Sequence, residues 1–252
     1  MDPILYYSLL LIAGIVGGFL NSVASSGAAV MLPLLISLGL PPAIANATNR
    51  VPIVAGFITS TIQFQRKKLI NWNIIGLLFI PMLVGTVIGV KSAESLNPAY
   101  FEYVIIFALC VALVLALTKS KQILTRPISK TTKVTIATYA LFFLMGIWSG
   151  LIILDTATFI LFTLTLHLGL DLIPANAIKS AICLILSFMS LFMYGLNGQV
   201  DWQVGAVLSI GSITGGYLGS SFAMKEQSKK WIFRILITVL STEIILALLK
   251  VL

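Results

Sequence analysis

Two short polar turns carry the side chains best suited to bind an anion. The first, ANATNR, ends at Arg50 and contains Asn46, Thr48 and Asn49. The second, ANAIKS, contains Asn176 and Lys179. Arginine offers planar N–H donors that match carboxylates, sulfates and sulfonates. These residues predict a cationic site for a small anion. The alternative is a pair of cations near helix ends that reach the membrane interface.

Small and hydroxyl-bearing residues precede two short apolar segments. They are Ser25, Ser26 and Gly27 in the first half of the chain, and Asp155, Thr156 and Thr158 in the second. A helix N-terminus offers free N–H groups and partial positive charge to an anion. We therefore expect these residues to line the same site, with plain helix capping as the alternative. Asp155 is either a cap or a carboxylate that couples transport to a proton or ion.

Other reactive side chains are scarce. The 252 residues include one histidine, His167, and two cysteines, Cys110 and Cys183, which both lie in apolar runs. We expect no catalytic residues, no metal site, no disulfide framework and no cofactor. A membrane enzyme is therefore the poorest of the functions considered.

Composition places these residues in a membrane protein. Hydrophobic residues make up 59% of the chain and charged residues 10%, against about 25% charged in soluble domains. The net charge of +8 comes mainly from short basic loops, which indicates membrane topology rather than nucleic-acid binding. The first apolar run follows Met1–Asp2–Pro3 with no basic stretch, which favours a retained helix over a cleaved signal. We expect a multi-pass protein of the inner or plasma membrane.

Ten apolar segments are expected along the chain. They fall at 4–22, 27–40, 44–65, 72–90, 99–118, 134–152, 156–170, 174–196, 202–222 and 231–250. A helix needs about 20 residues to cross the bilayer core. The segments at 27–40 and 156–170 are shorter, so each is expected to be a half-helix or one arm of a broken hairpin. Whether they cross fully or re-enter is left open.

The two halves of the chain share an internal repeat. Five features recur 130 positions apart: LGL at 38–40 and 168–170, ANA at 45–47 and 175–177, Trp72 and Trp202, Gly85 and Gly215, and Gly89 and Gly219. Five matches in one register indicate two related halves. We expect an all-helical polytopic protein with repeats at 1–118 and 134–252, joined by a basic cytoplasmic linker at 119–133. Each repeat would hold five segments, of which the second is short or broken.

The basic loops predict that the two repeats are inverted in the membrane. Residues 66–68, 119–133 and 225–230 are basic and are expected in the cytoplasm. The repeat equivalent of the first loop is NGQVD at 197–201, which has no basic residue. Only an inverted arrangement puts this loop outside and 225–230 inside. Inverted repeats with broken helices are typical of secondary transporters, whose site lies near the bilayer midplane.

The motifs also resemble those of a known family. SSGAAVMLP, LGL and ANATN in the first half, and LGLDLIPANAIK and NGQVDWQ in the second, are similar to motifs of the TauE/SafE family of sulfite and organosulfonate exporters. The resemblance covers nearly the whole chain and implies an inner-membrane transporter that moves small sulfur-containing anions outward. The breaks ASSGAA and ILDTATF differ from the glycine-rich breaks of the family. They fall on the expected substrate site.

The predicted function is export of sulfite or an organosulfonate by alternating access. A passive anion channel and a ten-helix transporter of the drug/metabolite type remain alternatives. The expected partners are the anion and the lipid bilayer, with no nucleic acid; a homodimer is left open. The sequence further predicts that Arg50→Ala abolishes transport and leaves folding intact.

Overall fold

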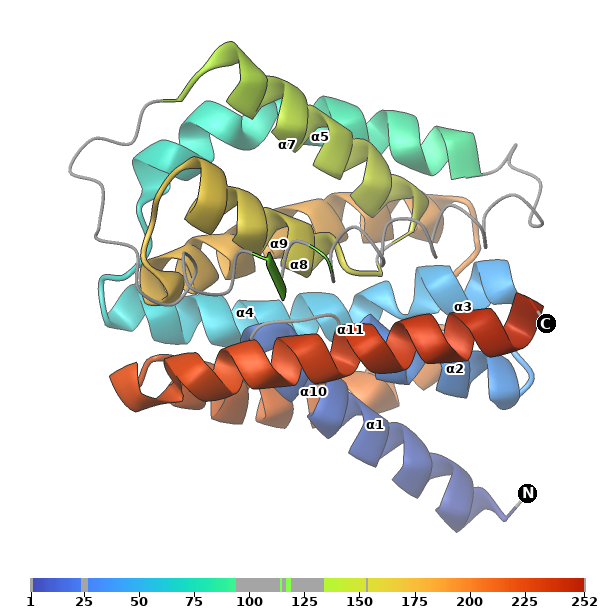
Figure 1. Ribbon diagram of the computed structural model, residues 1–252. Coiled ribbons are helices and arrows are strands. Elements are labelled where there is room, and N and C mark those ends of the chain that lie inside the picture. Colours follow the sequence, from blue (N-terminus) through green and yellow to red (C-terminus); the bar gives the residue numbers. More distant parts are fainter. Residues whose placement is uncertain are drawn as a thin grey trace.

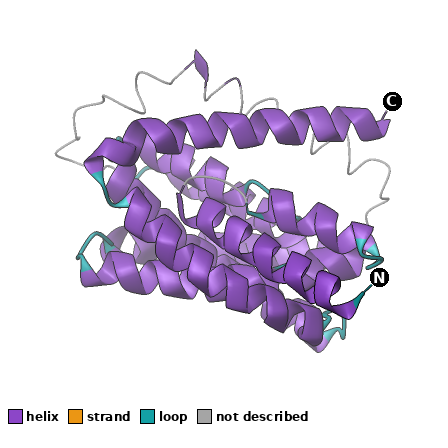
Figure 2. Cartoon of the chain, turned by 90° about the horizontal axis from the view of Figure 1, so that it is seen from below, coloured by secondary structure: helices purple, strands orange, loops and turns teal. Residues whose placement is uncertain are grey.

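The structure is a computed structural model. It describes residues 2–23, 27–93, 134–152 and 154–251, with 114, 117 and 118 between them. Within these ranges every regular element is a helix and no strand occurs (Figure 2). The predicted site residues Ser25 and Ser26, the linker at 119–133 and nearly all of the segment at 99–118 lie outside the described residues.

The helices follow the order of the expected apolar segments (Figure 1). In the first half they are α1 (Pro3–Val23), α2 (Ala28–Ser37), α3 (Pro42–Thr48), α4 (Arg50–Arg66) and α5 (Trp72–Ala93). In the second half they are α7 (Ile136–Leu151), α8 (Thr156–Phe162) with a π-helical turn (Thr163–His167), α9 (Leu172–Leu196), α10 (Trp202–Ala223), a short 3₁₀ turn (Glu226–Ser228) and α11 (Lys229–Val251).

One expected segment is divided. The stretch at 44–65 forms α3 and α4, with a break at Asn49. Pro52 explains the break, because proline has no N–H to donate to the carbonyl four residues earlier and its ring clashes with that carbonyl. The repeat equivalent of Pro52 is Ile182, and α9 continues through it without a break.

The two short segments are too short to cross a membrane. At 1.5 Å per residue, α2 is about 15 Å long, and α8 with its π-helical turn about 18 Å, against a core of about 30 Å. Three of the described helices are long and apolar enough to cross: Pro3–Val23, Trp72–Ala93 and Leu172–Leu196.

Glycines allow the longest helix contacts. α1 packs along α10, and α5 packs along α7. A Cβ at Gly215 would collide with the backbone of Ile15, and a Cβ at Gly85 with that of Phe143. Glycines in such positions let helix backbones approach closely, which is the main source of attraction between helices in lipid. α1 is the first helix of the first half and packs on α10 of the second half. α7 is the first helix of the second half and packs on α5 of the first half.

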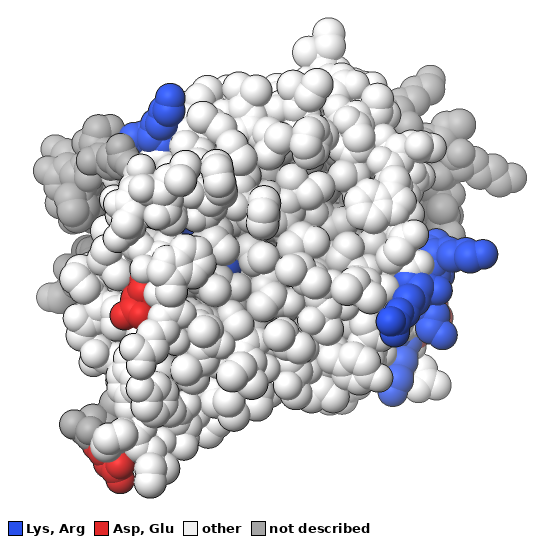
Figure 3. Space-filling view, turned by 180° about the vertical axis from the view of Figure 1, so that it is seen from behind, with Lys and Arg blue, Asp and Glu red and all other residues white. Residues whose placement is uncertain are grey.

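Charges divide the molecule into two ends. A group of basic side chains lies at one end of the molecule (Figure 3). The loops at 66–68 and 225–230 follow α4 and α10, whose last turns lie together, because Gln63 Nε2 of α4 donates to Tyr217 O of α10 at 3.2 Å. α9 begins at this same end, because Asp171 pairs with Lys229 at 2.9 Å. Both chain termini lie at the opposite end (Figures 1 and 2). Thus α4 and α10 run toward the basic end, and α9 runs away from it.

The glycine contacts generate a stability prediction. Gly215→Ala should lower the melting temperature of the purified protein by several degrees, because overpacking costs about 1–3 kcal/mol. Gly76→Ala is the matched control, since a Cβ on this helical glycine meets nothing within 4 Å. It should leave the melting temperature unchanged or slightly raised. Equal effects of the two substitutions would contradict the close packing of α1 and α10.

Candidate functional site

The C-terminal end of α7 is held by side chains of the first half. Arg50 Nη1 donates to Ser149 O at 2.9 Å, and Nη2 donates to Gly150 O at 3.2 Å. Asn46 Nδ2 donates to Leu151 O at 3.3 Å. The last carbonyls of a helix have no partner within it and carry partial negative charge. Arg50 and Asn46 thus cap the broken helix of the other half.

The C-terminal end of α1 is held in the same way by the second half. Lys179 Nζ donates to Asn21 O at 2.8 Å. Asn176 Nδ2 donates to Ser22 O at 2.8 Å and to Val23 O at 3.0 Å. These three carbonyls belong to the last described turn of α1, which ends at Val23.

The two caps are equivalent in the repeat. Asn46 and Asn176 are 130 positions apart, and Arg50 and Lys179 are 129 apart. Both cations are 0% exposed, so neither reaches the surface. Neither forms an ion pair with another described residue. Each cation therefore lies against carbonyls at a helix C-terminus, which carry partial negative charge.

Tyr194 of α9 completes the cap on α7. Its hydroxyl donates to Gly150 O at 3.0 Å, and its ring centroid lies 4.8 Å from the guanidinium carbon of Arg50. A cation over an aromatic ring is stabilised when both are desolvated. Sequence reasoning missed this residue, because its repeat equivalent, Phe64, has no hydroxyl and no motif contains either of them.

Other predicted residues of the first half have structural partners. The N–H of Gly27, just before α2, donates to Asn21 Oδ1 at 2.7 Å. Thr48 Oγ1 accepts from the N–H of Asp201 at 2.9 Å, across the two halves. Asn49 is fully buried, and its amide atoms have no hydrogen-bond partner among the described residues.

Asp155 directly precedes α8 in the left-handed conformation, with φ +58° and 1% of the residue exposed. Its Oδ1 accepts from Thr158 Oγ1 at 3.3 Å. Non-glycine residues in this region cost about 1–3 kcal/mol and occur most often at functional sites. The structure thus assigns Thr158 to the support of Asp155, while Thr156 faces a cavity.

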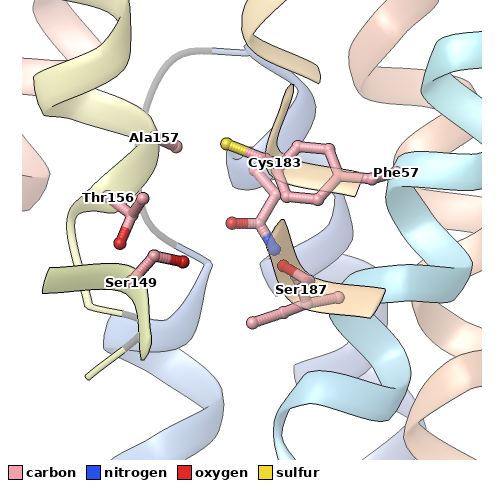
Figure 4. A pocket seen from close by; sticks show the side chains of 8 residues that line it. Phe57, Ser149, Thr156, Ala157, Cys183 and Ser187 are labelled. Atoms are coloured by element: carbon pink, nitrogen blue, oxygen red, sulfur yellow. The ribbon is translucent and has the colours of Figure 1, made fainter. Parts of the chain in front are cut away.

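That cavity lies between the halves (Figure 4). It is lined by Asn21, Ile53, Phe57, Ser149, Thr156, Ala157, Cys183 and Ser187. Figure 4 shows Ser149, Thr156 and Ala157 on one side, facing Phe57, Cys183 and Ser187 on the other. Its volume is about 10 Å³, which is room for about one water molecule.

The repeat register runs through the cavity wall. Ile53 and Cys183 are 130 positions apart, and so are Phe57 and Ser187. α4 and α9 pack on each other and contribute one wall residue of each pair. Ile53 and Phe57 lie about one and two helical turns after Arg50, and Cys183 and Ser187 are their repeat equivalents. The register could therefore have identified these four residues in the sequence, although no motif contains them.

Comparison with known proteins gives the family. The family model described as "Sulfite exporter TauE/SafE" matches residues 10–246, which is nearly the whole chain. The chain belongs to the TauE/SafE family. This confirms the resemblance seen in the motifs, and it points to a membrane transporter.

Curated relatives of this TauE/SafE chain carry the same general description. A "Probable membrane transporter protein" of Haemophilus influenzae is 26% identical, over 87% of this chain and 86% of the relative. YfcA of Escherichia coli K12 is 24% identical, over 91% and 84%. YunE of Bacillus subtilis is 24% identical, over 95% and 97%. Both are also described as probable membrane transporter proteins. No solved structure matches the chain.

The capping geometry changes the expectation for Arg50→Ala. This substitution leaves two buried carbonyls without Arg50 as partner and a void beside Tyr194, so we expect a marked loss of stability, about 2–4 kcal/mol. Tyr194→Phe keeps the ring and should cost only about 1 kcal/mol. Arg66→Ala, on an exposed basic residue at the end of α4, is the control and should cost almost nothing. Melting temperatures measure all three; an unaffected Arg50→Ala protein would contradict the capping role.

Proposed function

We propose that this TauE/SafE protein exports a small oxyanion, sulfite or an organosulfonate, across the inner or plasma membrane. The two halves act as inverted repeats and give alternating access to a cationic site between them. The proposal names the substrate class that the family description carries, and the charge of the protein interior supports it.

The observation that carries the proposal is the buried charge. Among the described residues the buried charged side chains are Arg50, Lys179 and Asp155. With all three ionised, these side chains carry a net charge of +1. A buried charge is costly unless it is paired. One bound monoanion would neutralise it, whereas a cation would raise it further.

Both cations act on the cavity wall. Arg50 binds the carbonyl of Ser149, and Lys179 binds the carbonyl of Asn21; both of these residues line the cavity. In a low-dielectric interior, fixed charges at this range contribute several times more than they would in water. The cavity therefore lies where positive potential from both halves overlaps, which favours an anion.

Inverted repeats are supported by direction and by packing. α4 runs toward the basic end and its equivalent, α9, runs away from it. The pairs α1–α10 and α5–α7 are the same contact with the halves exchanged. The two helix caps repeat this exchange. A rocking of one half against the other would carry the site from one face of the membrane to the other.

Asp155 is the proposed coupling residue. It is the buried carboxylate that directly precedes Thr156 of the cavity wall. Its protonation would change the buried charge from +1 to +2 and strengthen anion binding. Coupling is not required for export, because an inside-negative potential already drives a monoanion outward by about 2.3 kcal/mol per 100 mV.

Flux through proteoliposomes tests the function. The protein should give saturable efflux of radiolabelled sulfite or methanesulfonate, and an excess of unlabelled anion should inhibit it. Linear, non-saturable flux would favour a channel, and no flux of any oxyanion would overturn the proposal. If Asp155 couples transport, a pH gradient should change the rate in the wild type and have no effect in Asp155→Asn.

Cysteine labelling tests the inverted topology. A membrane-impermeant thiol reagent applied outside intact cells should label Asn197→Cys, in the loop after α9, because that loop is expected outside. It should label Lys67→Cys, after α4, only when the membrane is opened. The two sites lie in equivalent loops of the two repeats. Labelling of both from the same side would rule out inversion.

A further inference from the structure

The polar side chains that line the cavity are neutral, and two of them carry a buried atom with no hydrogen-bond partner among the described residues. Asn21 and Thr156 are each 4% exposed, and both line the cavity. Asn21 Nδ2 and Thr156 Oγ1 make no hydrogen bond with any described residue. Leaving a buried donor unsatisfied costs about 1–3 kcal/mol. Two such donors on one small cavity are therefore a feature that a ligand would explain.

The orientation of the Asn21 amide is fixed. The N–H of Gly27 donates to it at 2.7 Å, so the atom on that side must be the oxygen, Oδ1. Its –NH₂ group is therefore the end left over. Lys179 holds the backbone carbonyl of the same residue at 2.8 Å. Asn21 is thus anchored at two points and presents a donor that no described residue uses.

The two buried cations, Arg50 and Lys179, are not among the residues that line the cavity. Arg50 Nη1 and Nη2 bind Ser149 O and Gly150 O, and Lys179 Nζ binds Asn21 O. All three contacts are to backbone carbonyls, so the cations do not bind the side-chain groups that line the cavity. A cation that left its carbonyl to bind a ligand would uncap a helix in the low-dielectric interior, which carries its own cost. The cations therefore fit a supporting role better than direct contact.

We propose that the cavity between the halves is the oxyanion-binding site, and that Asn21 Nδ2 and Thr156 Oγ1 are its direct donors. Ser149, on the side of Thr156, and Ser187, on the facing side, also line the cavity, and their hydroxyls can add further hydrogen bonds (Figure 4). Arg50 and Lys179 are positioning residues, which fix Ser149 and Asn21 through their carbonyls and supply positive potential. The inference rests on the proposed function and names the residues of its site.

The site recognises a compact oxyanion with one apolar side. Asn21, Ser149, Thr156 and Ser187 offer polar groups, whereas Ile53 and Phe57 of α4 form an apolar wall. The present volume of about 10 Å³ has room for about one water molecule. An oxyanion of four or five heavy atoms therefore fits only after the walls separate, as the relative movement of the two halves would allow.

Binding measurements on variants of the two donors test the proposal. Asn21→Asp keeps the oxygen that accepts from Gly27 but replaces the donor with a negative charge. Thr156→Val removes the hydroxyl and keeps the shape. Each substitution should weaken the binding of sulfite and of methanesulfonate about 10-fold or more. The affinity is measured from the thermal stabilisation that each anion gives to the full chain. Thr165→Val is the matched control, because Thr165 is buried but its hydroxyl bonds its own helix, at Leu161 O. It should leave the affinity unchanged.

The native thiol of Cys183 gives a second readout that does not depend on a variant of the donors. In a Cys110→Ser background, methanesulfonate should slow modification of Cys183 by a small methanethiosulfonate reagent, because both occupy the cavity. Sulfite is not used in this arm, since it consumes the reagent. Wild-type affinity in Asn21→Asp and Thr156→Val, or no protection of Cys183 by an anion that binds, would overturn the cavity site while the proposed function stands. A wild-type protein that neither binds nor transports any oxyanion would overturn the function itself.

Discussion

Free carbonyl groups at the ends of broken helices are the constraint on which the rest of this structure depends. α1 ends at the buried Val23, and α7 ends at Leu151, just after the buried Ser149 and Gly150. Water is not available there to hydrogen-bond the last carbonyls, and each unsatisfied group costs several kcal/mol. The chain supplies an asparagine and a cation for each end. Because each pair comes from the other half, neither half can complete its broken helix alone.

This exchange explains why the cations are tolerated. An isolated charge inside an apolar protein is strongly unfavourable, but a helix C-terminus carries about half a negative charge spread over several carbonyls. Arg50 binds two such carbonyls and stacks on Tyr194, and Lys179 binds one. In the proposed function, the same two cations that hold the helix ends also supply the positive potential that favours an anion in the cavity.

The glycine contacts and the caps act together. Close packing of α1 on α10 and of α5 on α7 holds each first helix against the opposite half. The caps fix only the ends of those helices. A transporter needs a firm scaffold and a limited set of contacts that change between its conformations. The glycine-lined helix pairs suit the first role, and the hydrogen bonds around the cavity suit the second.

The sequence by itself determined the class of protein, most helix positions and the register that relates the two halves, because hydropathy and glycine spacing are local properties. It also picked out Arg50, Lys179, Asn46 and Asn176, since polar residues in apolar sequence are conspicuous. Only the tertiary structure decided what they touch. Their partners are backbone carbonyls about 100 to 160 positions away, and a carbonyl carries no sequence signal. For the same reason the sequence missed Asn21, Ser149, Ser187 and Tyr194, which come together only where α1, α7 and α9 meet.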